Sequence, residues 1–574
     1  MSLTDWIVLI VTLAGIILYG LYKSKSEKNL ESYFLLNRSS SWFLILLGIM
    51  GTQASAVTFL SAPGQSYTDG MRFVQYYFGL PLAMVVLCIT FVPVFHRLKL
   101  FTAYEFLEKR FDGKTRTFTS LLFLLQRGLS TGISISAPSI ILSSLLGWNI
   151  LWTNILMGGL LIIYTFTGGA KAVAYTQQIQ FIIIFAGMFI VGYTVVHLLP
   201  GNMGLSDALH IGGKAGKLNV ITSGRDEKGF QWNDRYNIWS GIIGGFFLQL
   251  SYFGTDQSQV GRYLTARSTR ASKLSLLLNG LVKVPMQFGI LLLGVLVFSY
   301  YQFAKEPLFF NQSQLDLLAK TKYADSLKIV MKDYDALQKE KIAQMNPSHG
   351  TVVENRMQQG LTMQYVQQRQ SGLRSIIQRW LNDKDVKGDA NDTNYIFLRF
   401  VVDHLPRGLV GLLIAVIFLS AWGSVAASLN ALSSATMNDI HKRLIRKPES
   451  QKKEYHYSQI YTLIWGIFCV VIAQLAYNIG NSLIEAVNVL GSLFYGVILG
   501  IFLVAFYLKK VGATPVFMSA VIVEIFVVGI HILNQKGIVN ISFLWLNAIG
   551  ALGVIGMSML LQGLTKAQGI KPNA

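Results

Sequence analysis

Long apolar segments recur along the whole chain, and they restrict it to a membrane-spanning fold. A helix needs about 20 apolar residues to cross the hydrocarbon core of a bilayer. Of the 574 residues, 52% are hydrophobic and only 14% are charged, and the mean hydropathy is +0.45. A soluble chain carries more charge than this. We therefore predict an all-α integral membrane protein with about thirteen transmembrane helices, near residues 4–22, 42–63, 73–95, 117–147, 150–167, 179–199, 236–254, 274–300, 409–436, 458–477, 482–507, 514–533 and 541–562.

Basic residues collect in the short loops between these segments. The clearest such loop, 96–116, contains Arg97, Lys99, Lys109, Arg110, Lys114 and Arg116. Because lysine and arginine mark cytoplasmic loops, the pattern predicts a multi-pass protein of the cell (inner or plasma) membrane, with the N-terminus outside and the C-terminus inside. The same loops account for the formal net charge of +20. The expected partners are the lipid bilayer and a small-molecule solute, with no role for nucleic acid and no prediction of an oligomeric state.

The apolar segment 42–63 is interrupted at its centre by the small and polar residues Gly51-Thr52-Gln53-Ala54-Ser55. A helix that opens there exposes backbone carbonyls at mid-membrane, which is tolerated only where the backbone lines a protein cavity. Transporters use such broken helices to bind ions and substrates. The alternative is a packing face of small residues between two helices.

A second interruption favours the transporter interpretation. We expect it in the segment 236–254, near Gly241, Gly244, Gly245 and Gln249. The predicted segments form two groups of five, 41–199 and 236–507, which begin on opposite sides of the membrane. Each group opens with an interrupted segment, and this is the inverted-repeat plan of secondary transporters, with the binding site at the paired breaks.

The remaining parts of the chain lie around these two repeats. Residues 1–40 are an accessory first span with a cytoplasmic loop, and 200–235 form an outer loop. Residues 508–574 supply accessory C-terminal spans and a short cytoplasmic tail. A long polar insertion, 303–392, interrupts the second repeat on the predicted outer side, and residues 315–345 within it have the apolar spacing of an amphipathic helix. We expect the insertion to cap the outer face.

Four motifs connect the chain to a known family. They are Thr167-Gly168-Gly169-Ala170-Lys171-Ala172-Val173 with Thr176 and Gln180; Asp256-Gln257 followed by Arg262-Tyr263-Leu264; Val402-Asp403-His404-Leu405-Pro406-Arg407-Gly408-Leu409; and Leu429-Asn430-Ala431 with Ser433, Met437 and Asp439. In this order and spacing, residues 5–510 resemble the sodium:solute symporter family, which includes sodium/glucose, sodium/proline and sodium/sialic acid cotransporters. The resemblance implies a leucine-transporter-like five-plus-five inverted repeat. It also implies sodium-coupled import of a small polar solute (a sugar, a sugar acid or another organic anion) by alternating access.

The resemblance also implies a site for the co-transported sodium ion between the first and eighth core helices. The matching positions are the carbonyls of Gly51 and Ala54, together with Ser420, Gly423 and Ser424. Gly423 departs from the family pattern because it has no hydroxyl, and Ser420, one turn from Ser424, is expected to compensate. Oxygen ligands of this kind suit a hard cation. Some relatives have a second cation site, but the matching positions here offer neither an acid nor a hydroxyl, which predicts a single sodium ion: Gln177, Ala426 and Ala427.

The substrate cavity follows from the same resemblance. The residues expected to line it are Gln53, Ser55, Thr58, Phe73, Tyr77 and Gln249, with Tyr252 as the inner gate. Aromatic and amide side chains together suit a sugar ring, but they also suit many other polar solutes. Tyr77 stands where the sugar-binding relatives have a glutamate or glutamine, which weakens the case for galactose-like recognition.

Arg127 is also assigned to the substrate site. It lies about ten residues into its span and so near mid-membrane, where an arginine is normally paired or functional. Its own helix offers no acid nearby, so its partner is either an acid from another helix or a carboxylate of the solute. A contact with helix carbonyls and snorkelling to the inner surface are further alternatives. Lys283, about ten residues into its own span, raises the same question.

Other protein classes fit the sequence less well. A membrane enzyme needs an intramembrane cluster of His, Asp, Glu or Cys, and no such cluster is evident, so neither an enzyme nor a resident metal is expected. A channel needs a continuous polar pore, against which the paired interruptions argue. Two alternatives stay open: a solute sensor that keeps the transporter fold, and a facilitator that is not coupled to sodium.

Overall fold

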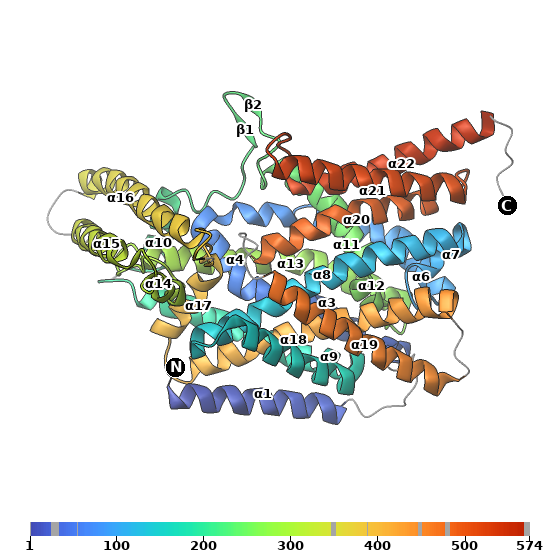
Figure 1. Ribbon diagram of the computed structural model, residues 1–574, viewed down its shortest axis with the longest axis horizontal. Coiled ribbons are helices and arrows are strands. Elements are labelled where there is room, and N and C mark those ends of the chain that lie inside the picture. The colour runs from blue at the N-terminus through green and yellow to red at the C-terminus, as the bar shows by residue number, and fades with distance from the viewer. Residues whose placement is uncertain are drawn as a thin grey trace.

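A computed structural model describes residues 2–23, 34–53, 55–201, 203–345, 352–386, 388–445, 450–476 and 483–567. Most of the helices lie side by side in one bundle (Figure 1). Within the described ranges, nine helices are long and apolar enough to cross a membrane, and one further pair of helices forms a broken span. Helix covers most of each segment that the sequence predicts as a span. The full number of spans and their orientation in the membrane remain predictions.

The bundle is built from helices whose bounds are α1 Leu3–Lys23, η1 Leu36–Arg38, α3 Trp42–Gln53, α4 Ala56–Asp69, η2 Met71–Tyr77, α5 Leu80–Val86, η3 Leu87–Phe91, α6 Val92–Leu98, α7 Glu105–Arg110, α8 Gly113–Leu146, α9 Ile150–His197, α10 Leu205–Lys214, η4 Ser240–Gly244, α11 Gly245–Gly254, α12 Gln257–Leu264, α13 Thr269–Tyr300, α17 Thr393–His404, α18 Leu409–Ala435, η5 Thr436–Ile445, α19 Gln451–Leu475, α20 Leu483–Tyr507, α21 Ala513–Gln535 and α22 Phe543–Ala567. The predicted outer loop holds a small hairpin of β1 Arg225–Asp226 and β2 Gly229–Phe230.

Helix α9 contains two of the predicted spans. Its helical assignment is continuous over 48 residues, which a straight helix would extend over about 72 Å, far more than a bilayer. Tyr164 and Thr176 are twelve residues apart, or about 18 Å along a straight helix, yet their hydroxyl oxygens lie only 2.9 Å apart. The helix therefore folds back on itself between these residues. The tight turn that the sequence predicts at 168–171 lies within this interval.

The first predicted break is present where the sequence places it. Helix α3 ends at Gln53 and α4 begins at Ala56, with the axes bent by 57°. Ser55 is in an extended conformation, with φ −80° and ψ 172°. The Thr58 hydroxyl donates to the freed Gln53 carbonyl at 2.9 Å. The backbone around the break is thus partly open and partly capped by side chains, as expected at a binding site.

The second break lies elsewhere than predicted. The glycines at 241, 244 and 245 do not interrupt the helix; they lie in η4 and at the start of α11, and the chain leaves the helix only at Thr255 and Asp256. A Cβ on Gly241 would lie 2.2 Å from the Gln75 carbonyl oxygen. These glycines therefore permit close helix packing, which is the alternative role for small residues in a membrane.

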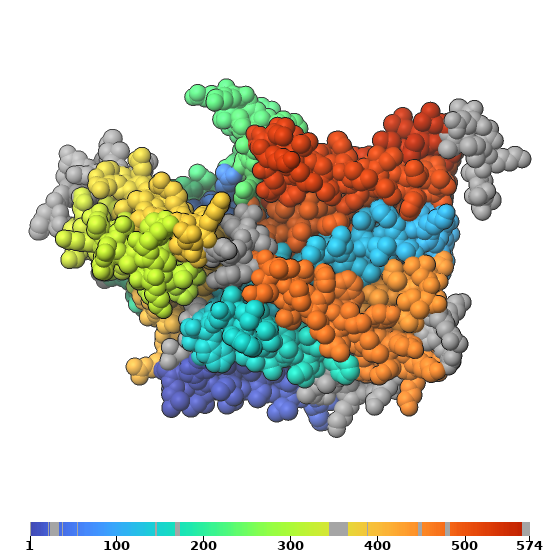
Figure 2. All heavy atoms as spheres, viewed as in Figure 1, coloured from blue at the N-terminus to red at the C-terminus, as the bar shows by residue number. Residues whose placement is uncertain are grey.

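The outer insertion forms a helical lobe of its own, made of α14 Gln312–Leu318, α15 Ala324–Met345 and α16 Val352–Leu381. It projects from one end of the bundle (Figure 2). The single amphipathic helix expected over 315–345 is instead divided between α14 and α15, because a turn at 319–323 separates them; the Thr321 hydroxyl donates to the Leu318 carbonyl at 2.8 Å there.

Glu306 anchors this lobe to the broken helix. Its carboxylate accepts a hydrogen bond from Tyr67 of α4 at 2.6 Å and forms ion pairs with Arg374 at 2.8 Å and Lys341 at 3.5 Å. Burial raises the pKa of the Glu306 carboxyl, but the two cations and the hydrogen bonds outweigh burial and hold that pKa below its usual value. The lobe is therefore tied directly to the helix that follows the first break.

The first described helix, α1, begins and the last, α22, ends at opposite ends of the bundle. The N-terminal end of α1 is on the same side as the insertion, and the C-terminal end of α22 is on the side of α7 (Figure 1). This arrangement agrees with an odd number of crossings. We call the end with α7 and the C-terminal end of α22 the inner end; its cytoplasmic location is the prediction made from the basic loops.

Candidate functional site

A polar cavity of about 120 Å³ lies in the middle of the bundle, next to the first break. The predicted substrate residues that line the cavity are Gln53, Ser55, Thr58, Tyr77, Arg127, Gln249 and Tyr252. Their side chains come from α3, α4, η2, α8 and α11, so the cavity brings together segments that are far apart in the sequence. A small polar solute matches its size and its lining.

Phe73 is the predicted substrate residue that does not line the cavity. It is fully buried, and its ring stacks on that of Tyr76 with centroids 5.6 Å apart and an interplanar angle of 6°. Residues 71–77 form a 3₁₀ helix, in which side chains three apart eclipse each other. Tyr76 therefore faces the cavity and Phe73 supports it from behind. Assigning Phe73 to the lining is wrong for this reason.

Arg127 has a protein partner. Its guanidinium forms an ion pair with Asp256, the residue at the second break, and donates to the Tyr495 hydroxyl at 2.9 Å. Tyr495 also donates to Asp256 at 2.6 Å, and the guanidinium lies 5.5 Å from the Tyr252 ring centroid. Of the two partners that the sequence left open for Arg127, the structure contains the acid from another helix. The charge of Arg127 therefore does not require a carboxylate from the solute.

Tyr252 lies at the side of the cavity that faces this ion pair. Its ring centroid is 6.0 Å from that of Tyr495, and Gln259 of α12 donates to its hydroxyl at 2.7 Å. The contact joins α11, α12 and α20 across the second break. This position is the one an inner gate requires, and the gating role stays a prediction.

Lys283 of α13 brings to this cavity an amine that makes no ion pair or hydrogen bond with the described residues. Its side chain is 1% exposed, and no described residue accepts a hydrogen bond from its Nζ. The Nζ lies 5.4 Å from the centroid of the Tyr77 ring, a cation–π distance. Lys283 lines the cavity. A buried ammonium of this kind needs a negative charge or several hydrogen-bond acceptors.

The residues of the predicted sodium site lie close together. A Cβ placed on Gly51 would be 3.1 Å from Gln177 Cβ, and one placed on Gly423 would be 3.1 Å from Gln177 Cγ. The Gln177 side chain from α9 therefore lies between the end of α3 and one face of α18. Ser420 and Ser424 lie on α18, and Ser424 also lines the central cavity. Ala54 lies outside the described residues.

The positions predicted to lack a second cation site are also close to this region. Gln177 is buried, its Oε1 has no hydrogen-bond partner among the described residues, and its Nε2 makes only a 3.5 Å contact with the Thr52 hydroxyl. Gln180 approaches from the same helix, with its Oε1 3.2 Å from the position of a Gly423 Cβ. Two amide groups thus occupy the space that a hydroxyl side chain at 423 would fill.

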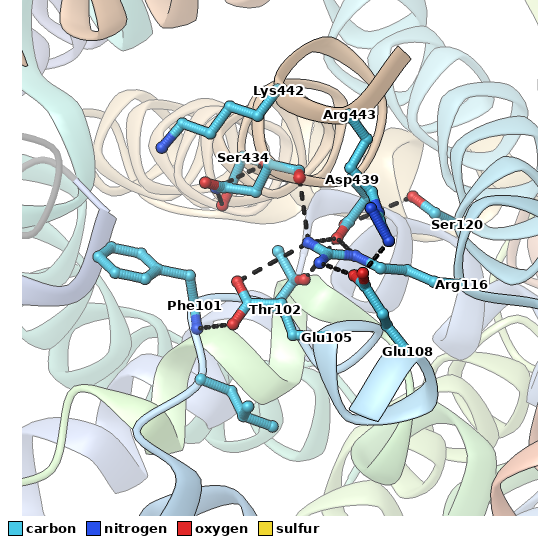
Figure 3. Close-up of polar contacts among 12 residues, drawn as sticks. Phe101, Thr102, Glu105, Glu108, Arg116, Ser120, Ser434, Asp439, Lys442 and Arg443 are labelled. Atoms are coloured by element: carbon cyan, nitrogen blue, oxygen red, sulfur yellow. Dashed lines mark hydrogen bonds and ion pairs between the residues drawn. The ribbon is translucent and has the colours of Figure 1, made fainter. Parts of the chain in front are cut away.

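A network of charged residues joins α7, α8 and η5 at the inner end of the bundle (Figure 3). Arg116 of α8 donates through Nε to Asp439 of η5 at 2.7 Å and through Nη1 to Glu108 of α7 at 2.7 Å. The Thr102 hydroxyl donates to the same Asp439 at 2.8 Å. The hydroxyl of Tyr104, two residues after Thr102 in the sequence, donates to the Thr255 carbonyl at 2.8 Å. The loop before α7 therefore connects η5 to the second break.

Several residues at the cavity were not predicted. The polar lining also includes Thr52, Tyr76, Gln126, Ser428, Asn488 and Tyr495. Polar residues inside apolar segments are the signal that would have found them. Asp256 was singled out only as part of a motif, because nothing in the sequence relates it to Arg127.

A helix broken at mid-span, a polar cavity beside the break and a charged network at the inner end define a secondary transporter. The profile of the Sodium:solute symporter family matches residues 33–314 and 361–523. The chain belongs to this family. It is accordingly a multi-pass membrane transporter that couples solute import to sodium, and not an enzyme. The gap in the match, 315–360, falls within the outer insertion.

Relatives and solved structures agree with this assignment. The chain is 25% identical to the sodium/sialic acid symporter SiaT of Proteus mirabilis over 555 residues, which cover 96% of this chain and 93% of that protein. It is 30% identical to the human sodium/iodide cotransporter over 283 residues, covering 48% and 42% of the two chains. The structure of a substrate-bound outward-open Na⁺-coupled sialic acid symporter covers 98% of each chain, with a TM-score of 0.74 and 22% identity. The similarity to this solved structure confirms the predicted fold class, an all-α membrane protein of the leucine-transporter type.

Proposed function

We propose that the protein imports a small organic anion, a sugar acid or another carboxylate, together with sodium by alternating access. The observation that carries the proposal is the buried amine of Lys283 at the central cavity, which has no hydrogen-bond acceptor among the described residues. A buried charge is tolerated where it is paired, and an anionic solute supplies the missing partner. Lys283, not Arg127, is therefore our candidate for the carboxylate-binding residue.

Neighbouring side chains complete the proposed solute site. Ser55, Thr58 and Gln249 offer hydroxyl and amide groups for the uncharged part of the solute, and Tyr77 offers a ring face. Relatives named for organic acids support the proposal, including the sodium-coupled monocarboxylate transporter 1 of Xenopus laevis, which is 24% identical over 92% of this chain and 72% of that protein. The inner gate would be Tyr252 with the Arg127–Asp256 pair beneath it.

Counterflow in proteoliposomes tests the proposal directly. Vesicles with the purified protein are loaded with unlabelled solute and given a panel of labelled sugars, sugar acids and short-chain carboxylates. We expect exchange of at least one carboxylate and no exchange of the matched neutral sugar or amide. Exchange of neutral sugars alone would contradict the anion proposal, and uptake at equal rates with and without sodium would identify a facilitator.

We further propose that four oxygen atoms of the described residues contribute to the sodium site. They are the Gly51 carbonyl, the hydroxyls of Ser420 and Ser424, and the Gln177 amide Oε1. Gln177 takes the place of the hydroxyl that Gly423 lacks, because its side chain lies between Gly51 and Gly423 and its Oε1 is buried without a hydrogen-bond partner among the described residues. Neutral oxygen ligands of this kind suit a hard cation that must also be released.

Removing one of these ligands is expected to weaken sodium binding. Ser424→Ala and Gln177→Leu should each raise the sodium concentration for half-maximal uptake about tenfold or more, since a hydrogen bond or ligand to a charged group contributes about 1.5–3 kcal/mol. Ser433→Ala is the control, because that hydroxyl donates to the Ser458 carbonyl at 2.6 Å, away from the proposed site. An unchanged sodium dependence in Ser424→Ala would show that the ion binds elsewhere.

We predict one sodium ion per solute molecule. The positions of the second cation site hold Gln177, Ala426 and Ala427, which provide neither a carboxylate nor the two hydroxyls such a site needs. Uptake should depend on sodium with a Hill coefficient near one, measured with saturating solute. A coefficient near two, together with an extra charge moved per solute in electrical recordings, would contradict this prediction.

A further inference from the structure

A second, smaller cavity lies on the inner side of the central one. Its volume is about 40 Å³, and it lies between α12 and α18 with residues 34–36 along one wall. Helix α18 lines both cavities, with Ser424 at the central one and Asn430 at the inner one. Six residues of helix correspond to about 9 Å along its axis. The inner cavity therefore lies between the central cavity and the inner end of the bundle.

Arg262 of α12 brings a fixed positive charge to this cavity. Its side chain is 8% exposed and lines the cavity, and no ion pair or hydrogen bond joins its guanidinium to any described residue. Its Nη1 lies 4.0 Å from the position of a Cβ on Gly48, so the group reaches the backbone of α3. An arginine stays protonated in proteins, and a buried charge without a counter-charge is costly.

The nearby acids of the described residues are already engaged. Asp256, at the start of the same helix, pairs with Arg127 and accepts hydrogen bonds from Ser258 at 2.6 and 2.8 Å. Asp439, beyond the end of α18, pairs with Arg116. Neither carboxylate makes an ion pair with Arg262 in the described part of the chain, so its charge is not neutralised there.

Asn430 provides a second free polar group at the same cavity. It is 6% exposed, and within the described ranges neither its Oδ1 nor its Nδ2 has a hydrogen-bond partner. Water molecules fit in a cavity of this size, but they do not neutralise a guanidinium. Guanidinium and amide N–H groups together are the donors that carboxylates and other anions accept from.

We infer that the inner cavity is a binding site for a small monovalent anion, held by Arg262 and Asn430. A halide or a carboxylate group matches its volume and its donors. The anion has two possible sources: free chloride, or the carboxylate of the transported solute on its way inward. The second source rests on the proposed function, whereas the site itself does not.

Thermal unfolding of the purified full-length protein tests the site without measuring transport. The protein is kept in detergent at constant sodium and ionic strength, with the bulky sulfonate MES, which is not a carboxylate, replaced stepwise by chloride or by formate. We expect a saturable rise in Tm with at least one of these small anions, because an anion that binds only the folded state stabilises it. The rise should be lost in Arg262→Gln and retained in Arg267→Gln, which changes an exposed arginine three residues beyond the end of the same helix.

Asn430→Asp is a second variant that keeps the test decisive if Arg262→Gln does not fold. It places a fixed carboxylate at the cavity, so its Tm should no longer depend on chloride or formate. A wild-type Tm that is equal in MES, chloride and formate would overturn the proposal, and so would an anion response that persists in either variant.

The same assay distinguishes the two sources of the anion. In Lys283→Met, which removes the proposed carboxylate partner from the central cavity, a Tm response to formate or to the solute would assign the inner cavity to the solute carboxylate. A response to chloride alone would assign it to the free ion. If Lys283→Met transports the solute normally, the substrate proposal fails while the anion response of Arg262 is unaffected.

Discussion

Replacing Arg127 by glutamine is expected to destabilise the folded protein by about 3 kcal/mol, the lower end of the range for breaking a buried ion pair. The substitution leaves the Asp256 carboxylate buried without its cation, because Asp256 is only 1% exposed. The loss stays at the low end since Tyr495 and Ser258 still donate to that carboxylate. The measurement is thermal unfolding in detergent, followed by the loss of the monodisperse folded protein.

The double variant Arg127→Gln with Asp256→Asn is the matched control. It removes both charges, and asparagine keeps the capping oxygen that Asp256 offers to the Ser258 backbone N–H at 2.8 Å. Most of the lost stability should return. If Arg127→Gln alone were as stable as the wild type, the Arg127–Asp256 ion pair would not stabilise the structure at the second break. Restored stability without solute transport would show that the charged pair is needed for transport itself, in the proposed inner gate or at the substrate.

Replacing Lys283 by methionine is expected to reduce the apparent affinity for the native solute by about 30-fold or more. Losing one partner of a buried, hydrogen-bonded charge pair at a binding site costs about 2–5 kcal/mol, and 1.4 kcal/mol corresponds to tenfold. Methionine retains the length of the side chain but not its charge. Sodium-dependent stabilisation should remain, because Lys283 is not among the proposed sodium ligands. The measurement is uptake into proteoliposomes over a range of solute concentrations.

Two further variants define what this result means. Lys283→Arg keeps the positive charge and should retain part of the transport activity. Lys273→Met changes a lysine on the same helix that does not line the central cavity, and uptake should be unaffected. Transport of the native solute at unchanged affinity by Lys283→Met would contradict the anion proposal, and a neutral solute would then be the substrate.

The local sequence determined the class of the protein. Apolar segments long enough to cross a bilayer, basic loops between them and a polar interruption at 51–55 are properties of neighbouring residues. A bilayer leaves few alternatives for a segment of that kind. The first break, the turn within α9 and the family were therefore available without a structure, and so was the part of the cavity lining beside the first break, Gln53, Ser55 and Thr58.

Only the tertiary structure decided how the charges are distributed. Arg127 and Asp256 are 129 residues apart, and no periodicity relates them, so sequence reasoning left a solute carboxylate as a possible partner. The role of Phe73 likewise depended on the ring of Tyr76, against which it packs. The role of the glycines at 241–245 depended on the backbone that approaches them, such as the Gln75 carbonyl at Gly241. Hydropathy reports whether a residue can lie in the membrane, whereas contacts between distant segments determine which buried charge is already neutralised. Those contacts neutralised Arg127 and left Lys283 and Arg262 without partners in the described part of the chain.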